Sequence, residues 1–436
     1  MADRSAIAHL LRRAGFGPTA DEVDAAERAG VEATLDRLLA PAGADPGAAA
    51  TPPPGLAADP TATIGSGSSR EERQQANRRR RQQGEQLIGW WLERMTAAEH
   101  QLTEKLVFFW HGHWATNLRK VRSAQLMLGQ LETLRLHGRG GLGPLVTAMV
   151  RDPALIRWLD GQRNTRAAPN ENLARELMEL FTLGIGHYTE DDVRAGARAL
   201  TGWTVDRRTG AARFVARRHD PGEKTILGRT AAFDAESYAL LLAGQPRSAA
   251  FVWSRLWLRF AGTGPAPEPT ATTAGPPADV LGMLRAVFTD PAFGQTQGQL
   301  AKQPVEWAVG AMRQLGIRPA DLTEQQRRQL QSGLSGMDQV PLRPPSVGGW
   351  PAGEAWLNTS SLQARLRLAD LFARTAGPVT ARRLAAAPEA GRVDALARLL
   401  VVDAWTDRTR AALTPLAADP ERLVAAGLVS PEYTVS

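Results

Sequence analysis

The chain has 436 residues, 43% hydrophobic and 22% charged, which are ordinary proportions for a globular protein with a large core. It contains no cysteine, and this excludes disulfides, thiolate nucleophiles and metal sites built on cysteine. The formal charge of +7 is carried mostly by arginine. Because basic and acidic residues alternate along nearly every expected helix, we expect a mixed surface, and a nucleic-acid partner is the less favoured interpretation. The arginine-rich stretch at 70–81 could form an RNA-binding arm, but we expect it to form the solvated first turns of a helix.

Signals for membrane insertion and export are not visible in the sequence. No window of about 18 residues is continuously apolar, so no membrane span is expected. The N-terminal stretch MADRSAIAHLLRRAGFG has neither the apolar core nor the small-residue cleavage site of a signal peptide. The expected location is therefore the cytoplasm, with export left open.

Helices are expected along most of the chain, because apolar residues recur with a helical period and capping residues precede many of these runs. In chain order they are expected at 5–13, from 19, and at 31–39, 70–95, 102–114, 143–151, 154–159, 170–184, 189–201, 235–242, 247–260, 278–289, 305–315, 362–375 and 381–416.

The segments between these helices are rich in Pro and Gly and are expected to form loops, notably at 40–69, 262–277 and 341–351. One short strand is expected, at Arg213–Val215. The predicted fold class is therefore all-α, a single large multi-helix domain with at most a minor strand pair. We expect this domain to span residues 1–376 with a flexible insert at about 41–84, and residues 377–436 to form a helical extension packed on it.

The stretch from Pro169 to Gly184 is predicted to be one helix with both ends marked. Asn170 can cap its first turn, and Gly184 can end it in a left-handed conformation. Its polar face carries Glu171, Asn172, Arg175, Glu176 and Glu179. The spacing permits solvated ion pairs, or a polar face turned into a cleft with Glu171 or Glu176 as a ligand or acid/base group.

His111 and His113 flank Gly112 in an apolar segment. They could share a metal ion if Gly112 ended the helix, but on a continuous helix they would lie about 200° apart. Structural hydrogen bonding and proton transfer are the alternatives.

Two loops carry further candidate residues. The loop His219–Lys224 combines His219, Asp220 and Lys224, which could bind an anionic substrate, and Trp203 precedes it. Trp350 follows two glycines and precedes a proline, with Asn358 nearby, a setting suited to stacking on a sugar ring or peptide. Each loop also has a purely structural interpretation, as a turn and as a plug of the helix bundle.

Several of these segments resemble a bacterial family known as domain of unknown function 1800. The resemblance is carried by NENLARELMELFTLGIGHYTEDDVRAGARALTGW at 170–203 and covers about residues 10–371. Further similar segments are LLRRAGFGPTADEV at 10–23, FFWHGHWATN at 108–117, HDPGEKTILG at 219–228, KQPVEWAVGAMRQLG at 302–316 and PPSVGGWPAGEAWLNTSSLQARL at 344–366. The resemblance implies a mostly helical single domain and no established reaction. It also implies a partner protein of a phosphatase-fold family. Many relatives look secreted, so the lack of a visible signal peptide is a departure.

The polar residues of four segments coincide with polar letters of the family signature, from which we expect one shared cleft. We expect a metal-dependent, hydrolase-like enzyme that acts on an anionic or carbohydrate-type substrate with Zn, Mn or Fe. The alternative is a non-catalytic binding or assembly protein that works with a partner. The expected catalytic residues are Glu171, Glu176, Arg175, His219, Asp220 and Lys224; the expected substrate-binding residues are Asn170, Asn172, Trp203, Trp350 and Asn358; and the expected metal ligands are His111, His113 and Glu176.

Overall fold

Helices form most of the protein, and many of them begin where the sequence places a capping residue. The computed structural model describes residues 4–262, 264–267 and 279–436, so most of the loop expected at 262–277 lies outside the described residues. In chain order the α-helices are α1 (Arg4–Ala14), α2 (Ala20–Ala29), α3 (Val31–Leu39), α4 (Pro46–Ala49), α5 (Arg70–Ala97), α6 (Gln101–His113), α7 (Leu118–Val121), α8 (Ala124–His137), α9 (Leu142–Val150), α10 (Pro153–Trp158), α11 (Asn172–Glu176), α12 (Glu190–Ala199), α13 (Ala235–Ala243), α14 (Pro246–Phe260), α15 (Val280–Thr289), α16 (Pro291–Gly294), α17 (Pro304–Leu315), α18 (Glu324–Gly336), α19 (Thr359–Ala385), α20 (Arg392–Leu399), α21 (Asp407–Leu413), α22 (Pro420–Leu428) and α23 (Pro431–Thr434).

The prediction of an all-α fold is confirmed, with two small antiparallel strand pairs among the described residues. The first pairs β1 (Trp203–Val205) with β2 (Ala212–Phe214), close to the strand expected at 213–215. The second pairs β3 (Lys224–Ile226) with β4 (Arg229–Ala231) and was not predicted. Each strand has three residues, too few for alternation to stand out in a sequence.

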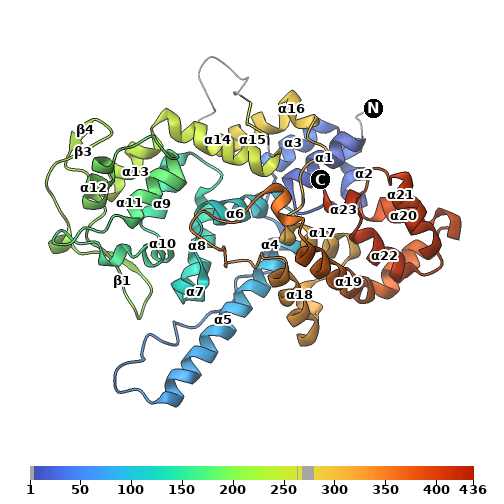
Figure 1. The fold of residues 1–436 in the computed structure, drawn as a ribbon, viewed down its shortest axis with the longest axis horizontal. Helices are drawn as coiled ribbons and strands as arrows, with labels where there is room; N and C mark the ends of the chain where they lie inside the picture. Colours follow the sequence, from blue (N-terminus) through green and yellow to red (C-terminus); the bar gives the residue numbers. More distant parts are fainter. Residues whose placement is uncertain (1–3, 263, 268–278) are drawn as a thin grey trace.

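One hydrophobic core joins the two ends of the chain. It runs from Leu10 to Tyr433 and includes residues of nearly every α-helix. Helices α9–α13 gather at one end of the molecule and α19–α23 at the other, with α6, α14 and α17 between them (Figure 1). The C-terminus returns to this middle part, where Ser436 and Leu300 exchange backbone hydrogen bonds. The expected domain boundary at residue 376 falls inside α19.

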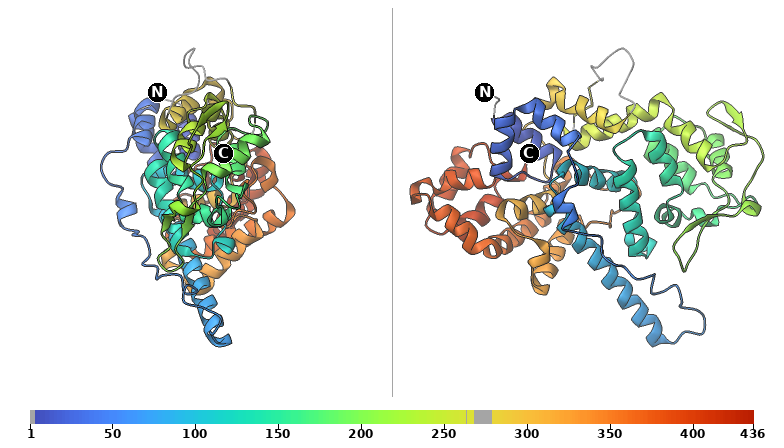
Figure 2. Two further views of the ribbon diagram at one scale, coloured as in Figure 1. Left: turned by 90° about the vertical axis from the view of Figure 1, so that its left-hand side faces the viewer. Right: turned by 180° about the vertical axis from the view of Figure 1, so that it is seen from behind.

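Helix α5 projects from the body of the protein (Figure 2). It begins at its outer tip with a capping box of Ser69 and Glu72, and residues 50–69 run outward beside it to that tip. The segment expected to be a flexible insert, 41–84, thus contains α4 and the first half of α5.

The helix predicted at 170–184 changes its winding midway. It is α-helical at α11 and continues as a π-helix, η2 (Leu177–Thr182), before Gly184 ends it with a φ of 86°. Thr182 Oγ donates to the carbonyl oxygen of Leu177 at 2.5 Å. π-Helical turns are rare and often occur near functional sites. The Phe181 carbonyl oxygen, in the last turn of this helix, accepts a hydrogen bond from His113 Nε2 at 3.0 Å.

Candidate functional site

Residues 341–353, which lie between α18 and α19, dock on α6 and α7 (Figure 1). We call them the docked segment. The backbone N–H of Leu118 donates to the Leu342 carbonyl at 2.9 Å, and the side-chain amide of Asn117 donates to the Pro344 carbonyl at 2.7 Å. Gly349 has a φ of 82°, and a Cβ there would collide with the carbonyl oxygen of Gly112 in α6. Only glycine fits both the backbone angle and this close approach. The docked segment places Trp350 against α6.

Docking of this segment closes one wall of a cavity. About 600 Å³ of empty space, part of it open to solvent, lies between α6, α14, the residues before α17 and the docked segment. A space of this size corresponds to a small ligand and not to a polymer. The lining residues are Phe108, Phe109, Gly112, His113, Arg255, Leu258, Arg259, Leu300, Ala301, Gln303, Trp350, Pro351, Ala352 and Gly353.

The aromatic part of the wall is rigid. The rings of Phe108 and Trp350 stack with centroids 5.6 Å apart, and the Arg259 guanidinium lies 5.5 Å from the centre of the Phe108 ring. The Trp350 indole N–H is buried and has no hydrogen-bond partner among the described residues. The wall thus combines an apolar surface with an unused donor and a cation.

A buried cluster of cations lies behind the cavity. Glu306 binds Lys105 and Arg259, with 2.9 Å between its carboxylate and the Arg259 guanidinium. Burial alone would raise the pKa of Glu306, but Arg259 and Lys105 outweigh it and hold the pKa at about 2. Arg13 and Lys302 also interact electrostatically with Glu306. The described residues therefore place four basic side chains around this one carboxylate.

Burial and mutual repulsion shift the titration of these cations. Burial lowers the pKa of Lys105 to about 8 and that of Arg13 to about 9, although Glu306 opposes both shifts. The pKa of Lys302 falls well below its ordinary value for the same reason, with Arg12 adding to the effect. The region behind the cavity is therefore short of negative charge.

Arg255 is a cation of the cavity wall that has no counter-charge among the described residues. It is half-buried in α14, and it forms no ion pair or side-chain hydrogen bond with any residue in the described parts of the chain. Burial lowers its pKa. Nearby, His113 is fully buried, and burial, with a smaller contribution from Arg255, lowers its pKa to about 3, so its ring is neutral. Its Nε2 donates to Phe181, which leaves Nδ1 as an unpartnered acceptor.

The expected metal ligands are not gathered into one coordination sphere. Helix α6 continues through Gly112, so His111 and His113 lie on different sides of it. His111 packs against Trp91 and Trp350 with ring centroids 5.4 and 5.5 Å away, and both ring nitrogens lack a partner. Glu176 is half-buried, and burial followed by the charge of Glu179 raises its pKa. Among the described residues, no group of three or more His, Asp or Glu is arranged to hold a metal ion.

The polar face of the helix expected at 170–184 is an ion-pair network near the surface. Arg175 binds Glu171 at 3.0 Å and Glu190 at 2.7 Å, and these pairs raise its pKa. Tyr188 donates its hydroxyl to Glu179 at 2.7 Å. These contacts satisfy the charged groups of the face within the chain.

The loop at 219–224 is also held by internal contacts. Asp220 binds Arg198 at 2.6 Å, and this hydrogen bond holds the pKa of Asp220 low. Lys224 donates to the carbonyls of Asp220 and Gly222 at 2.6 and 2.8 Å. His219 Nδ1 lies 3.0 Å from the Thr201 carbonyl. These contacts explain the residues of the loop as the framework of a turn.

The remaining expected substrate-binding residues serve local structure. Asn170 accepts a hydrogen bond from the backbone of Asn172, whose side chain is exposed. Trp203 begins β1 and packs on Phe214. Asn358 caps α19, accepting a hydrogen bond from the backbone N–H of Ser361. Trp350 is thus the expected substrate-binding residue that lines the cavity, together with the expected metal ligand His113.

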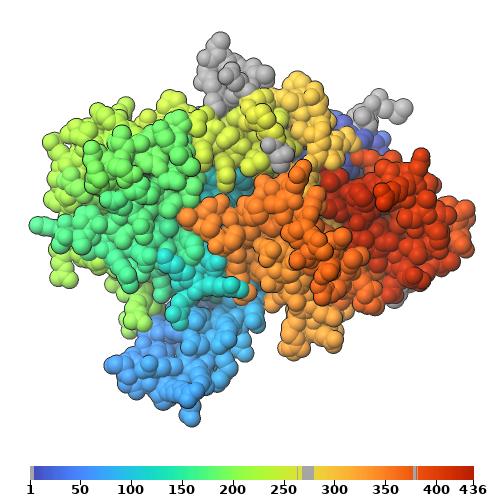
Figure 3. Space-filling model, viewed as in Figure 1, coloured from blue at the N-terminus to red at the C-terminus, as the bar shows by residue number. Residues whose placement is uncertain are grey.

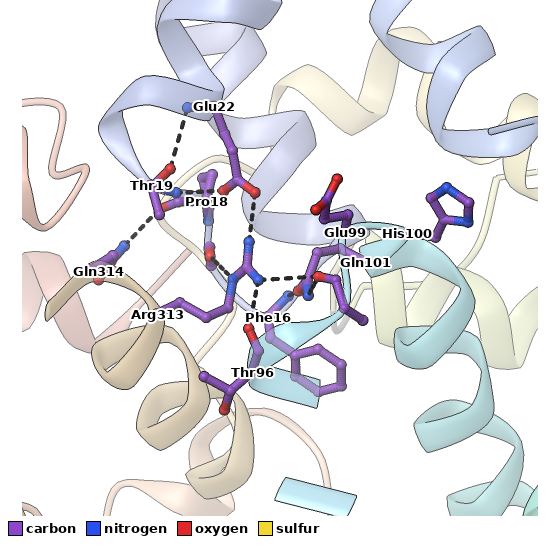
Figure 4. Close-up of polar contacts among 12 residues, drawn as sticks. Phe16, Pro18, Thr19, Glu22, Thr96, Glu99, His100, Gln101, Arg313 and Gln314 are labelled. Carbon is purple, nitrogen blue, oxygen red and sulfur yellow. Dashed lines mark hydrogen bonds and ion pairs between the residues drawn. The ribbon is translucent and has the colours of Figure 1, made fainter. Parts of the chain in front are cut away.

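A second, larger cavity lies beside the N-terminal helices and the first turn of α6. Part of its wall is formed by residues 10–23, one of the segments that resemble the family. Figure 4 shows Arg313 of α17 at the centre of this region. It donates to the carbonyls of Gly17 and Thr96, each at 2.9 Å, and binds Glu22 at 2.7 Å. These contacts clamp the N-terminal turn onto α17, which is a structural role.

Reasoning from sequence did not identify Arg255, Arg259, Gln303 or the Glu306 cluster as site residues. Arg255 and Arg259 stand four apart in α14, a spacing that places them on one face of a helix. Lys302, Gln303 and Glu306 lie in one of the segments that resemble the family. What marks them is the combination of charge with burial, and burial is not visible in a sequence.

Within the described residues, no helix combines the length and the apolar character needed to cross a bilayer.

Searches of curated proteins and of solved structures found no match for the chain. The model of the family described as "Protein of unknown function (DUF1800)" matches residues 9–435, further toward the C-terminus than the resemblance noted in the sequence. The chain therefore belongs to the DUF1800 family.

Proposed function

We propose that the protein binds a small organic anion in the cavity between α6, α14 and the docked segment 341–353. The observation that carries the proposal is Arg255, a half-buried cation in the cavity wall with no acidic partner among the described residues. A buried guanidinium without a counter-charge is costly, and a bound carboxylate or phosphate would relieve that cost.

The surroundings of Arg255 support an anion in particular. The cations behind the wall outnumber the carboxylate that they share, so the potential in the cavity is positive. Gln303 supplies a neutral hydrogen-bonding group in the lining. Leu258, Leu300 and the stacked rings supply the apolar surface that a small organic body requires.

This proposal keeps the anionic or carbohydrate-type ligand expected from the sequence and favours the binding-protein alternative. The cavity lining contains no Asp or Glu to act as a general base, and His113 is a neutral ring bound to a backbone carbonyl. The expected metal ligands do not form a group. Binding is therefore the activity that these side chains support best.

The test is calorimetric titration of the purified protein with matched pairs of anions and neutral analogues. Suitable pairs are benzoate with benzamide, and a sugar phosphate with the free sugar. We expect at least one anion to bind while its neutral partner does not. Arg255→Gln removes a charge-assisted contact of about 1.5–3 kcal/mol, which corresponds to a loss of about ten- to hundredfold in affinity.

The control is Arg374→Gln, which removes the same charge from an exposed ion pair on α19. We expect it to bind the anion as the parent does. Equal binding of anion and neutral analogue, or equal affinity of the Arg255→Gln variant and the parent, would contradict the proposal. So would a failure of every anion to bind.

A further inference from the structure

The projecting part of α5 carries a run of arginines that the rest of the chain does not neutralise. Arg78, Arg79 and Arg81 are exposed, and none of them forms an ion pair with a described residue. Arg80 is half-buried, and its Nη1 has no hydrogen-bond partner. Glu71 and Glu72 lie at the far tip of the helix, where Glu72 is held in the capping box.

The arginine run continues onto the body of the protein. Gly84 of α5 packs so closely on α7 that an added Cβ would lie 3.0 Å from the Leu118 side chain. Arg119 and Arg122, in and just after α7, are exposed and have no side-chain partner in the described chain. Burial lowers the pKa of Arg80, and the nearby charge of Arg122 lowers it further. In Figure 3 the projecting part of α5, in blue, and the teal region that contains α7 lie next to each other on the lower side of the molecule.

We call Arg78, Arg79, Arg80, Arg81, Arg119 and Arg122 the basic face. The acidic groups that face it are few. Asp59 lies between Arg80 and Arg157, and Asp160 is bound to Lys120 at 2.9 Å. Glu85 lies near Arg343. The face thus keeps an excess of positive charge, although basic and acidic residues alternate along the chain as a whole.

The composition of the basic face selects among anionic partners. Membrane surfaces and protein partners are normally held by apolar anchors as well as by charge. The exposed large hydrophobic side chains of the described residues lie outside α5, α7 and α10. Phosphate backbones require only cations, and arginine binds phosphate through two parallel hydrogen bonds. One face of the Trp158 ring is covered by Lys120 at 5.3 Å, and no large exposed aromatic side chain of the described residues lies on α5, α7 or α10 to stack on unpaired bases.

From this combination we propose that the basic face binds the phosphate backbone of double-stranded nucleic acid, without sequence preference. The exposed half of α5, residues 70–83, is about 20 Å long at the helical rise, enough to follow several phosphates. The site is separate from the cavity and does not depend on what the cavity binds.

The test is fluorescence anisotropy of the full chain with a labelled DNA duplex of about 20 base pairs and arbitrary sequence, titrated at increasing salt. The variant is Arg78→Gln/Arg79→Gln/Arg81→Gln. Each lost phosphate contact lowers the slope of log affinity against log salt by about 0.9, so we expect a decrease of up to about 3. Affinity near physiological salt should fall at least tenfold.

The matched control is Arg328→Gln/Arg374→Gln/Arg410→Gln, which removes the same charge from exposed ion pairs elsewhere. It should leave the slope unchanged. A second variant, Arg119→Gln/Arg122→Gln, tests the face from another element and should also reduce the slope. Equal slopes for the first variant and the control would overturn the proposal. It would also be overturned if the parent failed to bind the duplex, or bound only vesicles of anionic lipid.

Discussion

Glu306 is the most informative single residue to change, because it is the carboxylate that the buried cations share. Replacing it with Gln keeps the size of the side chain but leaves Lys105, Arg259, Arg13 and Lys302 without a counter-charge. Removing one partner of a buried ion pair typically costs about 3–5 kcal/mol. The pKa of Glu306, about 2 against an ordinary 4.5, points to a similar magnitude, since one pKa unit is worth about 1.4 kcal/mol.

The depressed pKa also fixes the direction of a pH effect. Because the folded protein holds Glu306 ionised, its contribution to stability is fully present above about pH 4.5. It is lost progressively as the pH falls from about 4.5 through about 2, and below that pH the carboxylate is protonated in both states. The Glu306→Gln variant has no such carboxylate, so the difference in unfolding free energy between parent and variant should shrink across this window.

Urea denaturation followed by tryptophan fluorescence measures both effects. We expect Glu306→Gln to lose about 3–5 kcal/mol at pH 7. The control, Glu324→Gln, breaks an exposed pair with Arg328 and should cost about 0–1 kcal/mol. If the two variants were equally stable at pH 7, or if the cost of Glu306→Gln did not change below pH 4.5, the cluster would not be the charged, buried set that we describe.

Two further predictions test the docked segment and the helix at 170–184. Gly349→Ala should destabilise the protein by more than Gly228→Ala, because both glycines have positive φ but only at Gly349 would the Cβ strike a neighbouring backbone. The backbone angle alone costs about 1–2 kcal/mol in either variant. If both variants lost the same unfolding free energy in urea denaturation, the docked segment would have moved away from α6 without cost, which would contradict the prediction. Arg175→Gln should cost less than about 1 kcal/mol in the same assay, because its ion pairs lie near the surface. It should also leave anion affinity unchanged in calorimetry, and a large loss of affinity would mean that this face belongs to the binding site.

Local features of the fold could be predicted closely from sequence. Helices α2 and α12 begin where they were expected, and each begins with a capping box, of Thr19 with Glu22 and of Thr189 with Asp192, that depends on residues only three positions apart. The helix containing the two histidines is also where it was expected, with Gly112 inside it. Apolar periodicity therefore sufficed for the all-α class.

Predictions that required distant contacts were less successful. The polar residues at 170–179 and 219–224 were expected to converge on a cleft, but each set is satisfied by neighbours such as Glu190 and Arg198. Their charges gave no indication of whether the partner would be a ligand or another part of the chain. The π-helical turn at η2 was not predicted either, and its Phe181 carbonyl is bound by His113, which is 68 positions away in the sequence.

The sequence by itself determined the helices, their caps and the family, because these depend on the order of residues along short stretches. The tertiary structure decided which charges are neutralised. Arg255 has no counter-charge among the described residues and the basic face keeps an excess of positive charge, whereas Arg175 is paired with Glu171 and Lys224 is held by backbone carbonyls. The physical reason is that electrostatic energy depends on distance in space and on burial, and the fold sets both.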